Sequence, residues 1–327
     1  MSWAADVRPV TDNRHPIADP EQSTRSARLG LLSGVAAIVL WSFTAALVCL
    51  GADAMGVWAF LAVAALTGGG LQMGLRRAYH GELRSAVSLP SRLWAVTIFG
   101  FVLYGVIYPL AVALAGSEAE RCGVNLINYL WPPLTVVCGV LWVPPTRFRP
   151  VLGLAIALAL GGTVLANAGP IRAAWGDLGR ADGVWTAASV LPYLLALIGA
   201  VVWAIYSSLL ARWRRWCRHY NTSAIGLVMV GLIAGLVAFG TESGGSGLTG
   251  IGLLAAVLCG LGPQCGGYML WELALVRADV KTLGLLGAMT PILSTLWLCL
   301  LLRFLPGYEL ILAAILVSGA VVLSTRS

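Results

Sequence analysis

Aromatic and amide side chains that could hold a small molecule lie inside strongly apolar segments of this chain. Tyr104 and Tyr108 are four residues apart, which places both rings on one face of a helix. Gln264 and Tyr268 repeat that spacing farther along the chain. A phenol or amide buried without a partner costs about 1–3 kcal/mol, so these groups should face the protein interior or a hydrated cavity.

The candidate binding residues share an aromatic or amide side chain and a position within an apolar segment. We predict that they line one site, made of Trp41, Tyr104, Tyr108, Asn128, Tyr129, Trp131, Trp203, Tyr206, Gln264 and Tyr268. Aromatic walls with a few amides suit an aromatic or large apolar amino acid, through ring stacking and through contact of its ammonium group with a ring face. Because aromatic residues in apolar helices more often only pack, the hypothesis depends on their convergence.

Glu272 is an acidic residue near the end of an apolar segment. A charge at the centre of a membrane costs about 2.5–3.5 kcal/mol, so Glu272 either carries a coupling proton or gates the protein, or it is solvated or paired with Arg277 at the segment end. Its position near the end favours the second interpretation. Three prolines within apolar segments are further gating candidates: Pro132, Pro133 and Pro291.

The sequence lacks the residue patterns that metal binding, catalysis or signal output would require. The 3 histidines (His15, His80 and His219) lie outside the apolar segments, and the 7 cysteines form no C-x-x-C pair, so we expect no metal and no cofactor. The sequence holds no H-E-x-x-H, G-x-S-x-G or P-loop motif, which argues against an enzyme. The connectors are too short for the output domain of a sensor.

Apolar segments of membrane-spanning length fill the chain. Hydrophobic residues make up 59% of it and charged residues 11%, whereas a soluble domain carries about 25% charged residues. About 20 apolar residues cross a bilayer as a helix, so we predict an all-α integral membrane protein. The ten predicted spans are 29–51, 56–75, 93–115, 122–142, 150–168, 188–210, 222–240, 250–271, 282–302 and 306–324.

Basic residues predict the orientation of these spans. With the N-terminus inside, the cytoplasmic segments hold all of the 21 basic residues except Arg121, Arg172, Arg180 and Arg303. Positive charge is retained on the cytoplasmic side, so both termini are predicted to be cytoplasmic. The arginines sit in separate short loops, which favours contact with membrane lipid over binding of nucleic acid.

The two halves of the chain resemble each other. Trp41 and Trp203 lie near the middle of the first and sixth spans, and the Pro132 and Pro291 segments occupy the fourth and ninth. Halves of five spans must insert in opposite orientations, which predicts two inverted five-helix repeats around a central cavity. We divide the chain into a cytoplasmic tail (1–28), a first repeat (29–168), a periplasmic connector (169–187) and a second repeat (188–324).

Two motifs resemble a known family. The string Ala274-Leu275-Val276-Arg277-Ala278-Asp279, followed by Ala288-Met289-Thr290-Pro291-Ile292, is similar to the end of an EamA repeat of the drug/metabolite transporter superfamily. The string Asn128-Tyr129-Leu130-Trp131-Pro132 resembles the YddG-type exporters of aromatic amino acids. The resemblance implies ten helices in two inverted repeats, cytoplasmic termini, a central cavity and amino acid export. The Trp271-Glu272 pair departs from the pattern, where a neutral polar residue is expected after the tryptophan.

These observations predict a multi-pass exporter of aromatic and other neutral amino acids in the bacterial inner membrane. It would work as a monomer, by alternating access, on the gradient of its substrate or of a coupled ion. The alternative is a broad-specificity exporter of neutral metabolites or drugs on the same fold. Binding of single amino acids, compared with binding of unrelated cationic drugs, separates the two.

Overall fold

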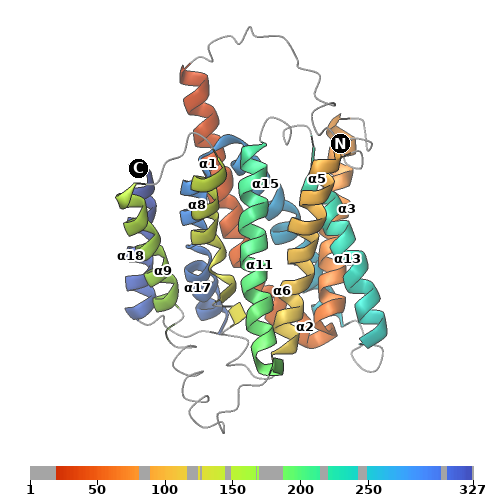
Figure 1. The fold of residues 1–327 in the computed structure, drawn as a ribbon. Helices are drawn as coiled ribbons and strands as arrows, with labels where there is room; N and C mark the ends of the chain where they lie inside the picture. The colour runs from red at the N-terminus through yellow and green to blue at the C-terminus, as the bar shows by residue number, and fades with distance from the viewer. Residues whose placement is uncertain are drawn as a thin grey trace.

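Helices form all of the regular structure in the described part of this computed structural model (Figure 1). The structure describes residues 20–80, 89–115, 124–125, 127–143, 149–166, 168, 187–213, 220–241, 249–302 and 308–325. Every one of the ten predicted spans contains a helix. The predicted connector, apart from Ala187, and residues 1–19 of the predicted tail lie outside the described residues.

Six helical stretches in the described part are long and apolar enough to cross a membrane: Thr24–Val48, Val57–Tyr79, Ser91–Val112, Val190–Arg212, Thr222–Thr241 and Gly250–Arg277. Four shorter apolar stretches accompany them: Trp131–Trp142, Pro150–Leu165, Val280–Ser294 and Ile311–Ala320. Large apolar side chains such as Phe239 (83% exposed) and Phe99 (70% exposed) face outward. Such a surface suits lipid and not water, so the fold is that of an integral membrane protein.

The first helix differs from the prediction. Helix α1 (Pro20–Ser42) starts inside the predicted tail of residues 1–28, so only part of that range precedes the helix. Pro20 is the first helical residue, a position where its missing N–H has no partner to lose. The polar composition of this turn hid the helix from a search based on hydrophobicity.

Several spans are built from two helices with a break between them. After a turn at Phe43, α2 (Thr44–Met55) continues α1 and ends beside Gly56, whose φ of 89° favours glycine. Phe43 stacks on Trp297 with centroids 4.2 Å apart. A turn at Ala288 and Met289 separates α16 (Val280–Gly287) from α17 (Thr290–Leu302). These breaks leave short helix ends inside the bundle.

The three candidate gating prolines lie in the first turns of helices. Pro132 and Pro133 follow Trp131 at the start of α8 (Trp131–Trp142), and Pro291 is the second residue of α17. Proline is tolerated there because the first N–H groups of a helix have no intrahelical acceptor. The prolines therefore mark where the two helices begin, and each helix follows a turn.

Two spans contain a π-helical segment. One span runs through α5 (Ser91–Val96), η1 (Thr97–Val102) and α6 (Leu103–Leu114). The other runs through α14 (Gly250–Cys259), η2 (Gly260–Gly267) and α15 (Tyr268–Arg277). A π-turn holds more residues than an α-turn and often marks a functional site. Pro263 inside η2 lacks the N–H that an α-helix would use, which fits the local change of helix type.

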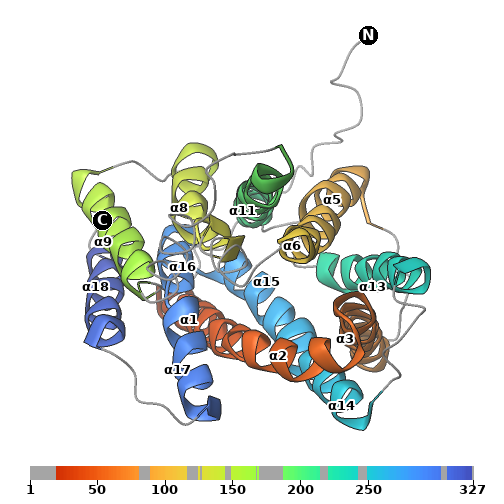
Figure 2. The ribbon, with the colours of Figure 1, turned by 90° about the horizontal axis from the view of Figure 1, so that it is seen from below.

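The remaining long helices complete the bundle. They are α3 (Val57–His80), α9 (Pro150–Ala166), α11 (Ala187–Arg212), α13 (Thr222–Thr241) and α18 (Tyr308–Thr325). Figure 2 shows α9 and α18 at one side of the bundle, α3 and α13 at the other, and α1 beside α15 between them. A Cβ on Gly68 of α3 would lie 2.7 Å from the Cβ of Gln264, so glycine permits the close approach of α3 to η2.

Candidate functional site

Five aromatic rings meet in the middle of the bundle, and we refer to them as the aromatic cluster: Trp41, Trp131, Trp203, Tyr268 and Trp271. The Trp41 ring lies 5.3 Å from Tyr268, 5.3 Å from Trp271 and 5.9 Å from Trp203, centroid to centroid. Trp131 lies 5.6 Å from Trp271 and 6.5 Å from Trp203. These separations are typical of aromatic pairs in contact. The cluster joins α1, α8, α11 and α15.

The indole N–H groups of the cluster bond to neighbouring helices. Trp41 Nε1 donates to the carbonyl oxygen of Pro263 in η2 at 3.1 Å, and Trp271 Nε1 donates to Ser207 Oγ at 3.2 Å. A Cβ on Gly267 would lie 2.6 Å from Trp41 Nε1, and one on Gly287 would collide with the ring of Trp131. Only glycine at these positions lets the Trp41 and Trp131 rings pack against the backbone of the neighbouring helices.

Two tyrosines extend the aromatic surface along α6. Tyr104 lies 4.9 Å from Trp203, and its ring is almost parallel to that of Tyr108, with an interplanar angle of 2° and centroids 5.9 Å apart. The predicted common face of Tyr104 and Tyr108 is confirmed. The Tyr108 hydroxyl donates to Asn125 Oδ1. The tyrosines thus form a continuous wall from the cluster toward the segment that precedes α8.

Asn128 contributes an unsatisfied polar atom to this wall. Its Nδ2 donates to the Tyr104 hydroxyl at 3.4 Å, while its Oδ1 is buried without a hydrogen-bond partner and the residue is only 4% exposed. Thr290 Oγ1, at the start of α17, is also buried and unpaired. A buried acceptor without a donor is costly, and a bound molecule with an N–H group would satisfy Asn128.

Three predicted site residues make other contacts. The Tyr206 ring packs 5.1 Å from Trp203, but its hydroxyl turns to Thr222 and Glu272. Tyr129 pairs with Ser294 of α17. Gln264 lies against α3, where its carbonyl oxygen accepts from Gln72. The sequence placed Gln264 and Tyr268 on one α-helical face, whereas Gln264 lies in η2, where the wider turn changes which residues share a face.

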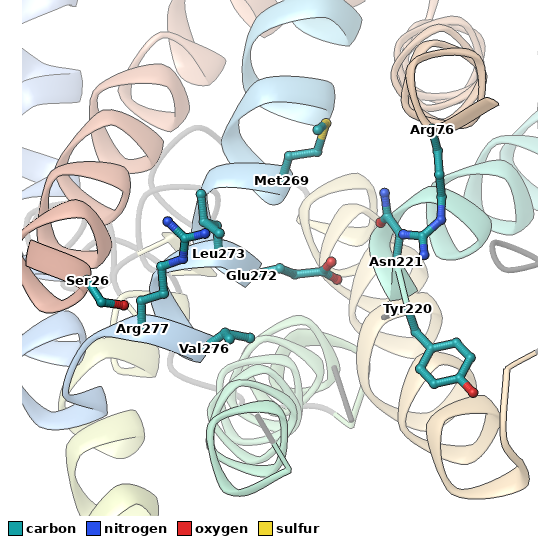
Figure 3. Close-up of a pocket in the computed structure, with 9 residues that line it drawn as sticks. All are labelled: Ser26, Arg76, Tyr220, Asn221, Met269, Glu272, Leu273, Val276 and Arg277. Atoms are coloured by element: carbon teal, nitrogen blue, oxygen red, sulfur yellow. The ribbon is translucent and has the colours of Figure 1, made fainter. Parts of the chain in front are cut away.

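Glu272 is held by the start of α13. Its Oε1 accepts from the Tyr206 hydroxyl at 2.8 Å, from the Ser223 N–H at 2.8 Å and from Thr222 Oγ1. Figure 3 shows Glu272 directed toward Asn221 and Arg76, with Arg277 on the other side of the helix and turned away. The sequence offered Arg277 as a partner; these donors and Arg76, whose charge is close enough to interact with it, take that role.

A cavity of about 370 Å³ opens beside Glu272. Arg76 and Asn221 line one side of it, while Leu273 and Val276 of α15 line another (Figure 3). Tyr268 of the aromatic cluster lies one helical turn before Glu272, so the cavity adjoins the cluster. The bundle therefore carries two adjoining candidate regions, one aromatic and one charged.

Sequence reasoning missed Arg76, Asn221, Thr222 and Ser223 around Glu272, and it also missed three residues with uncharged side chains. Trp271 is fully buried in the cluster, and its spacing of three from Tyr268 was a usable signal for a shared face. Phe101 packs 4.7 Å from Tyr268. Gln72 is fully buried, its Nε2 donating to the carbonyls of Gln264 and Cys265 and its Oε1 accepting from Ser223. A glutamine inside an apolar span was the available signal for Gln72.

No metal centre is present among the described residues, because no group of three or more His, Cys, Asp or Glu side chains there could hold an ion. Cys138, Cys259 and Cys265 are free. Among the described residues that line the cavity, Glu272 is the one with a carboxyl group, and its neighbours carry hydroxyl, amide and guanidinium groups.

The three relatives reported below carry the same name, although no model of a protein family matches the chain. The aromatic amino acid exporter YddG of Ancylobacter novellus is 30% identical over 297 residues, covering 90% of this chain and 96% of that protein. YddG of Salmonella typhimurium is 26% identical over 83% of this chain and 88% of its own, and YddG of Escherichia coli is 25% identical over 88% and 94%.

A solved crystal structure of a protein described without a function also matches. It is 27% identical, covers 91% of this chain and 97% of its own, and superposes with a TM-score of 0.77. The shared fold and the 30% identity over nearly the full length of both chains show that this protein belongs to the YddG family of aromatic amino acid exporters.

Proposed function

We propose that this protein exports aromatic and other neutral amino acids across the bacterial inner membrane. The observation that carries the proposal is the aromatic cluster with its neighbour Asn128, whose unpaired Oδ1 is buried beside Tyr104. Rings at contact distance can stack on a flat side chain, and the orphan acceptor can take an N–H of the ligand. The exporters named among the relatives support the same substrate class.

Transport by alternating access requires the rings to separate and close again. In this conformation the rings of Trp41, Trp131 and Trp203 touch, so a substrate must part them on its way through the centre. The helix breaks before Trp131 and Thr290 offer places where short helices can tilt, because each helix follows a turn and has proline in its own first turn. Pro132, Pro133 and Pro291 are gating candidates in this sense only.

We further propose that ten spans form two inverted repeats of five. Helix packing supports this: α3 packs on α13, α8 on α16 and α9 on α18, and each pair joins spans that are five apart. The same two-fold operation exchanges the α1–α15 contact with the α11–α6 contact. The π-segments η1 and η2 also fall in spans five apart, the third and the eighth. Such symmetry suits a site between repeats.

The same arrangement supports a proposed orientation in the membrane, with both termini in the cytoplasm. The start of α1, the end of α11 and the end of α18 lie at one end of the bundle, and α1 and α11 run in opposite directions (Figure 1). Arg76, Arg212 and Arg277 each lie near a helix end, and by the retention of positive charge we assign that end to the cytoplasm. The cavity beside Glu272 would then face the cytoplasm, where an exporter collects its substrate.

Exchange in proteoliposomes tests the proposed function. The purified chain should accumulate labelled phenylalanine in vesicles preloaded with unlabelled phenylalanine, tryptophan or leucine, and protein-free vesicles should not. Cationic drugs loaded instead should not drive uptake. Drug-driven uptake equal to that with phenylalanine would favour the broad-specificity alternative, and no exchange with any amino acid would refute amino acid export. Imposing a proton gradient on the same vesicles separates coupled transport from facilitated transport.

A further inference from the structure

The cavity at the arginine-rich end is lined by groups of opposite charge on opposite sides. Arg76 reaches it from α3, and Glu272 reaches it from α15 (Figure 3). The carboxylate of Glu272 and the guanidinium of Arg76 are close enough for their charges to interact. The apolar side chains of Met269, Leu273 and Val276 lie along the same wall as Glu272. The guanidinium group of Arg76, the carboxyl group of Glu272 and an apolar strip therefore line one space of about 370 Å³.

The Glu272 carboxylate is fixed in place. Three donors from two other helices converge on its Oε1: the Tyr206 hydroxyl, the Thr222 hydroxyl and the Ser223 N–H. Asn221 orders this helix start, because its Oδ1 accepts from the Ala224 N–H at 3.0 Å and from Ser223 Oγ at 2.9 Å. A carboxyl group that is held in one orientation can bind a cation with little loss of entropy.

We propose that this pocket receives the zwitterionic head of an α-amino acid, with Arg76 binding the carboxylate and Glu272 binding the ammonium group. The assignment rests on the proposed function, since it names where the transported amino acid is first bound. Arginine suits a carboxylate because its planar fork can make two parallel hydrogen bonds. The apolar strip of Met269 and Leu273 would take the side chain.

The pocket is connected to the aromatic cluster through two residues. Tyr206 donates to Glu272 with its hydroxyl while its ring packs on Trp203. Tyr268, in the cluster, precedes Glu272 by one helical turn on the same face. An amino acid that binds its head at Glu272 and Arg76 thus lies beside the rings that it must part next. The alternative role for the two charges is a closing ion pair that touches no ligand.

Ligands that lack one charge distinguish these roles. We would measure binding to the purified full chain by isothermal titration calorimetry with phenylalanine, phenethylamine, which lacks the carboxylate, and 3-phenylpropionate, which lacks the ammonium group. Wild type should bind phenylalanine at least about tenfold more tightly than either analogue, because each loses one charge-assisted contact. Equal binding of the three ligands would overturn the proposal without any variant.

Matched variants assign each charge. Arg76→Gln should weaken phenylalanine about tenfold and leave phenethylamine unchanged, while Glu272→Gln should weaken phenylalanine about tenfold and leave 3-phenylpropionate unchanged. Arg77→Gln is the control, because Arg77 follows Arg76 in α3 and is exposed, and it is not among the residues that line the cavity. Arg76→Lys and Glu272→Asp keep the charge, so their affinities for phenylalanine should lie between those of wild type and of the neutral variants.

Two results would overturn the inference while leaving export intact. One is binding of phenylalanine by both neutral variants with wild-type affinity. The other is an equal loss for all three ligands, which is the behaviour of a closing ion pair. If wild type neither binds phenylalanine nor exchanges it in vesicles, the proposed function itself fails, so the two failures are separable.

Discussion

The centre of the bundle and the pocket at its arginine-rich end are built from different chemistry. At the centre, rings from α1, α8, α11 and α15 pack edge to face, and the indole N–H groups of Trp41 and Trp271 are satisfied within the protein. In the pocket, Glu272 and Arg76 face a cavity, and the carboxylate is held by donors from two helices.

This difference suggests a division of labour between the two regions. Aromatic walls discriminate by shape and surface, so the centre should select among amino acid side chains. Opposed charges discriminate by the presence of carboxylate and ammonium groups, so the pocket should select amino acids from other molecules. Substitutions at the centre should therefore change side-chain preference, and substitutions in the pocket should change all amino acids alike.

The largest effect is expected at the centre, from Trp203→Ala. Trp203 is 3% exposed and contacts Trp41, Trp131 and Tyr268, so its loss removes a shared wall. We expect exchange of phenylalanine per folded molecule to fall at least about a hundredfold, the equivalent of about 2.7 kcal/mol. Initial rates in proteoliposomes measure it.

Two controls separate the loss of a ring from the loss of volume. Trp203→Phe should retain most exchange, whereas Trp203→Leu should not. Phe99→Ala, on the outward face of the same bundle and 70% exposed, should exchange like wild type. Equal rates for Trp203→Ala and Phe99→Ala would show that the aromatic cluster is only a packing core.

Gln72→Leu should lower stability and spare selectivity. Its Nε2 donates to the backbone carbonyls of Gln264 at 3.3 Å and Cys265 at 3.1 Å, and its Oε1 accepts from Ser223 Oγ at 2.9 Å. Leucine would remove these buried hydrogen bonds and cost about 1–3 kcal/mol in the free energy of unfolding. Thermal unfolding in detergent measures it, with Ser223→Ala as a milder variant at the other end of the bond. A changed ratio of tryptophan to phenylalanine binding would place Gln72 at the site instead.

Asn128→Leu should lower affinity without lowering stability. The Oδ1 of Asn128 is buried and unpaired, so its removal relieves a cost in the ligand-free protein. If that atom accepts from the substrate, the affinity for tryptophan should fall about tenfold, or about 1.4 kcal/mol. Calorimetry and the unfolding midpoint give both quantities. A lower midpoint with unchanged affinity would mean that Asn128 only supports the fold.

The smallest effect is expected from Tyr206→Phe in the polar network. The change removes one donor to Glu272 and keeps the ring against Trp203. Phenylalanine binding should weaken about two- to tenfold, because one of the three donors that orient the Glu272 carboxylate is lost, with the tryptophan-to-phenylalanine ratio unchanged. Tyr79→Phe is the matched control, because Tyr79 is 81% exposed and is not among the residues that line the cavity. A changed ratio of tryptophan to phenylalanine binding would show that the pocket also selects among side chains, which would contradict the division of roles between centre and pocket.

The sequence predicted the centre better than the pocket, for a physical reason. Trp41, Trp131 and Trp203 lie near the middles of spans that an apolar search finds, and aromatic residues at matching depths must meet if the spans form one bundle. Tyr104 and Tyr108 obeyed the α-helical spacing because α6 is a regular helix at both residues. Here local periodicity was sufficient.

Reasoning from α-helical spacing failed where the backbone departs from a regular α-helix. Gln264 was assigned to the face of Tyr268 by a spacing of four, but η2 is π-helical over Gly260–Gly267 and turns Gln264 toward α3. The partners of Glu272 come from residues 206, 222 and 223, which no spacing within one span can reveal. Arg277 was the nearest charge in sequence, yet it points to the other side of the helix (Figure 3).

Photo-crosslinking tests most directly whether an amino acid occupies the aromatic cluster. A benzophenone-bearing phenylalanine would be bound to the purified chain, activated by light and mapped by mass spectrometry, with and without excess phenylalanine. We expect labelled peptides from α1, α8 and α11 around Trp41, Trp131 and Trp203, and loss of the label when phenylalanine competes. Labelling confined to outward residues such as Phe99 and Phe239, or labelling that phenylalanine does not displace, would contradict a substrate site at the centre.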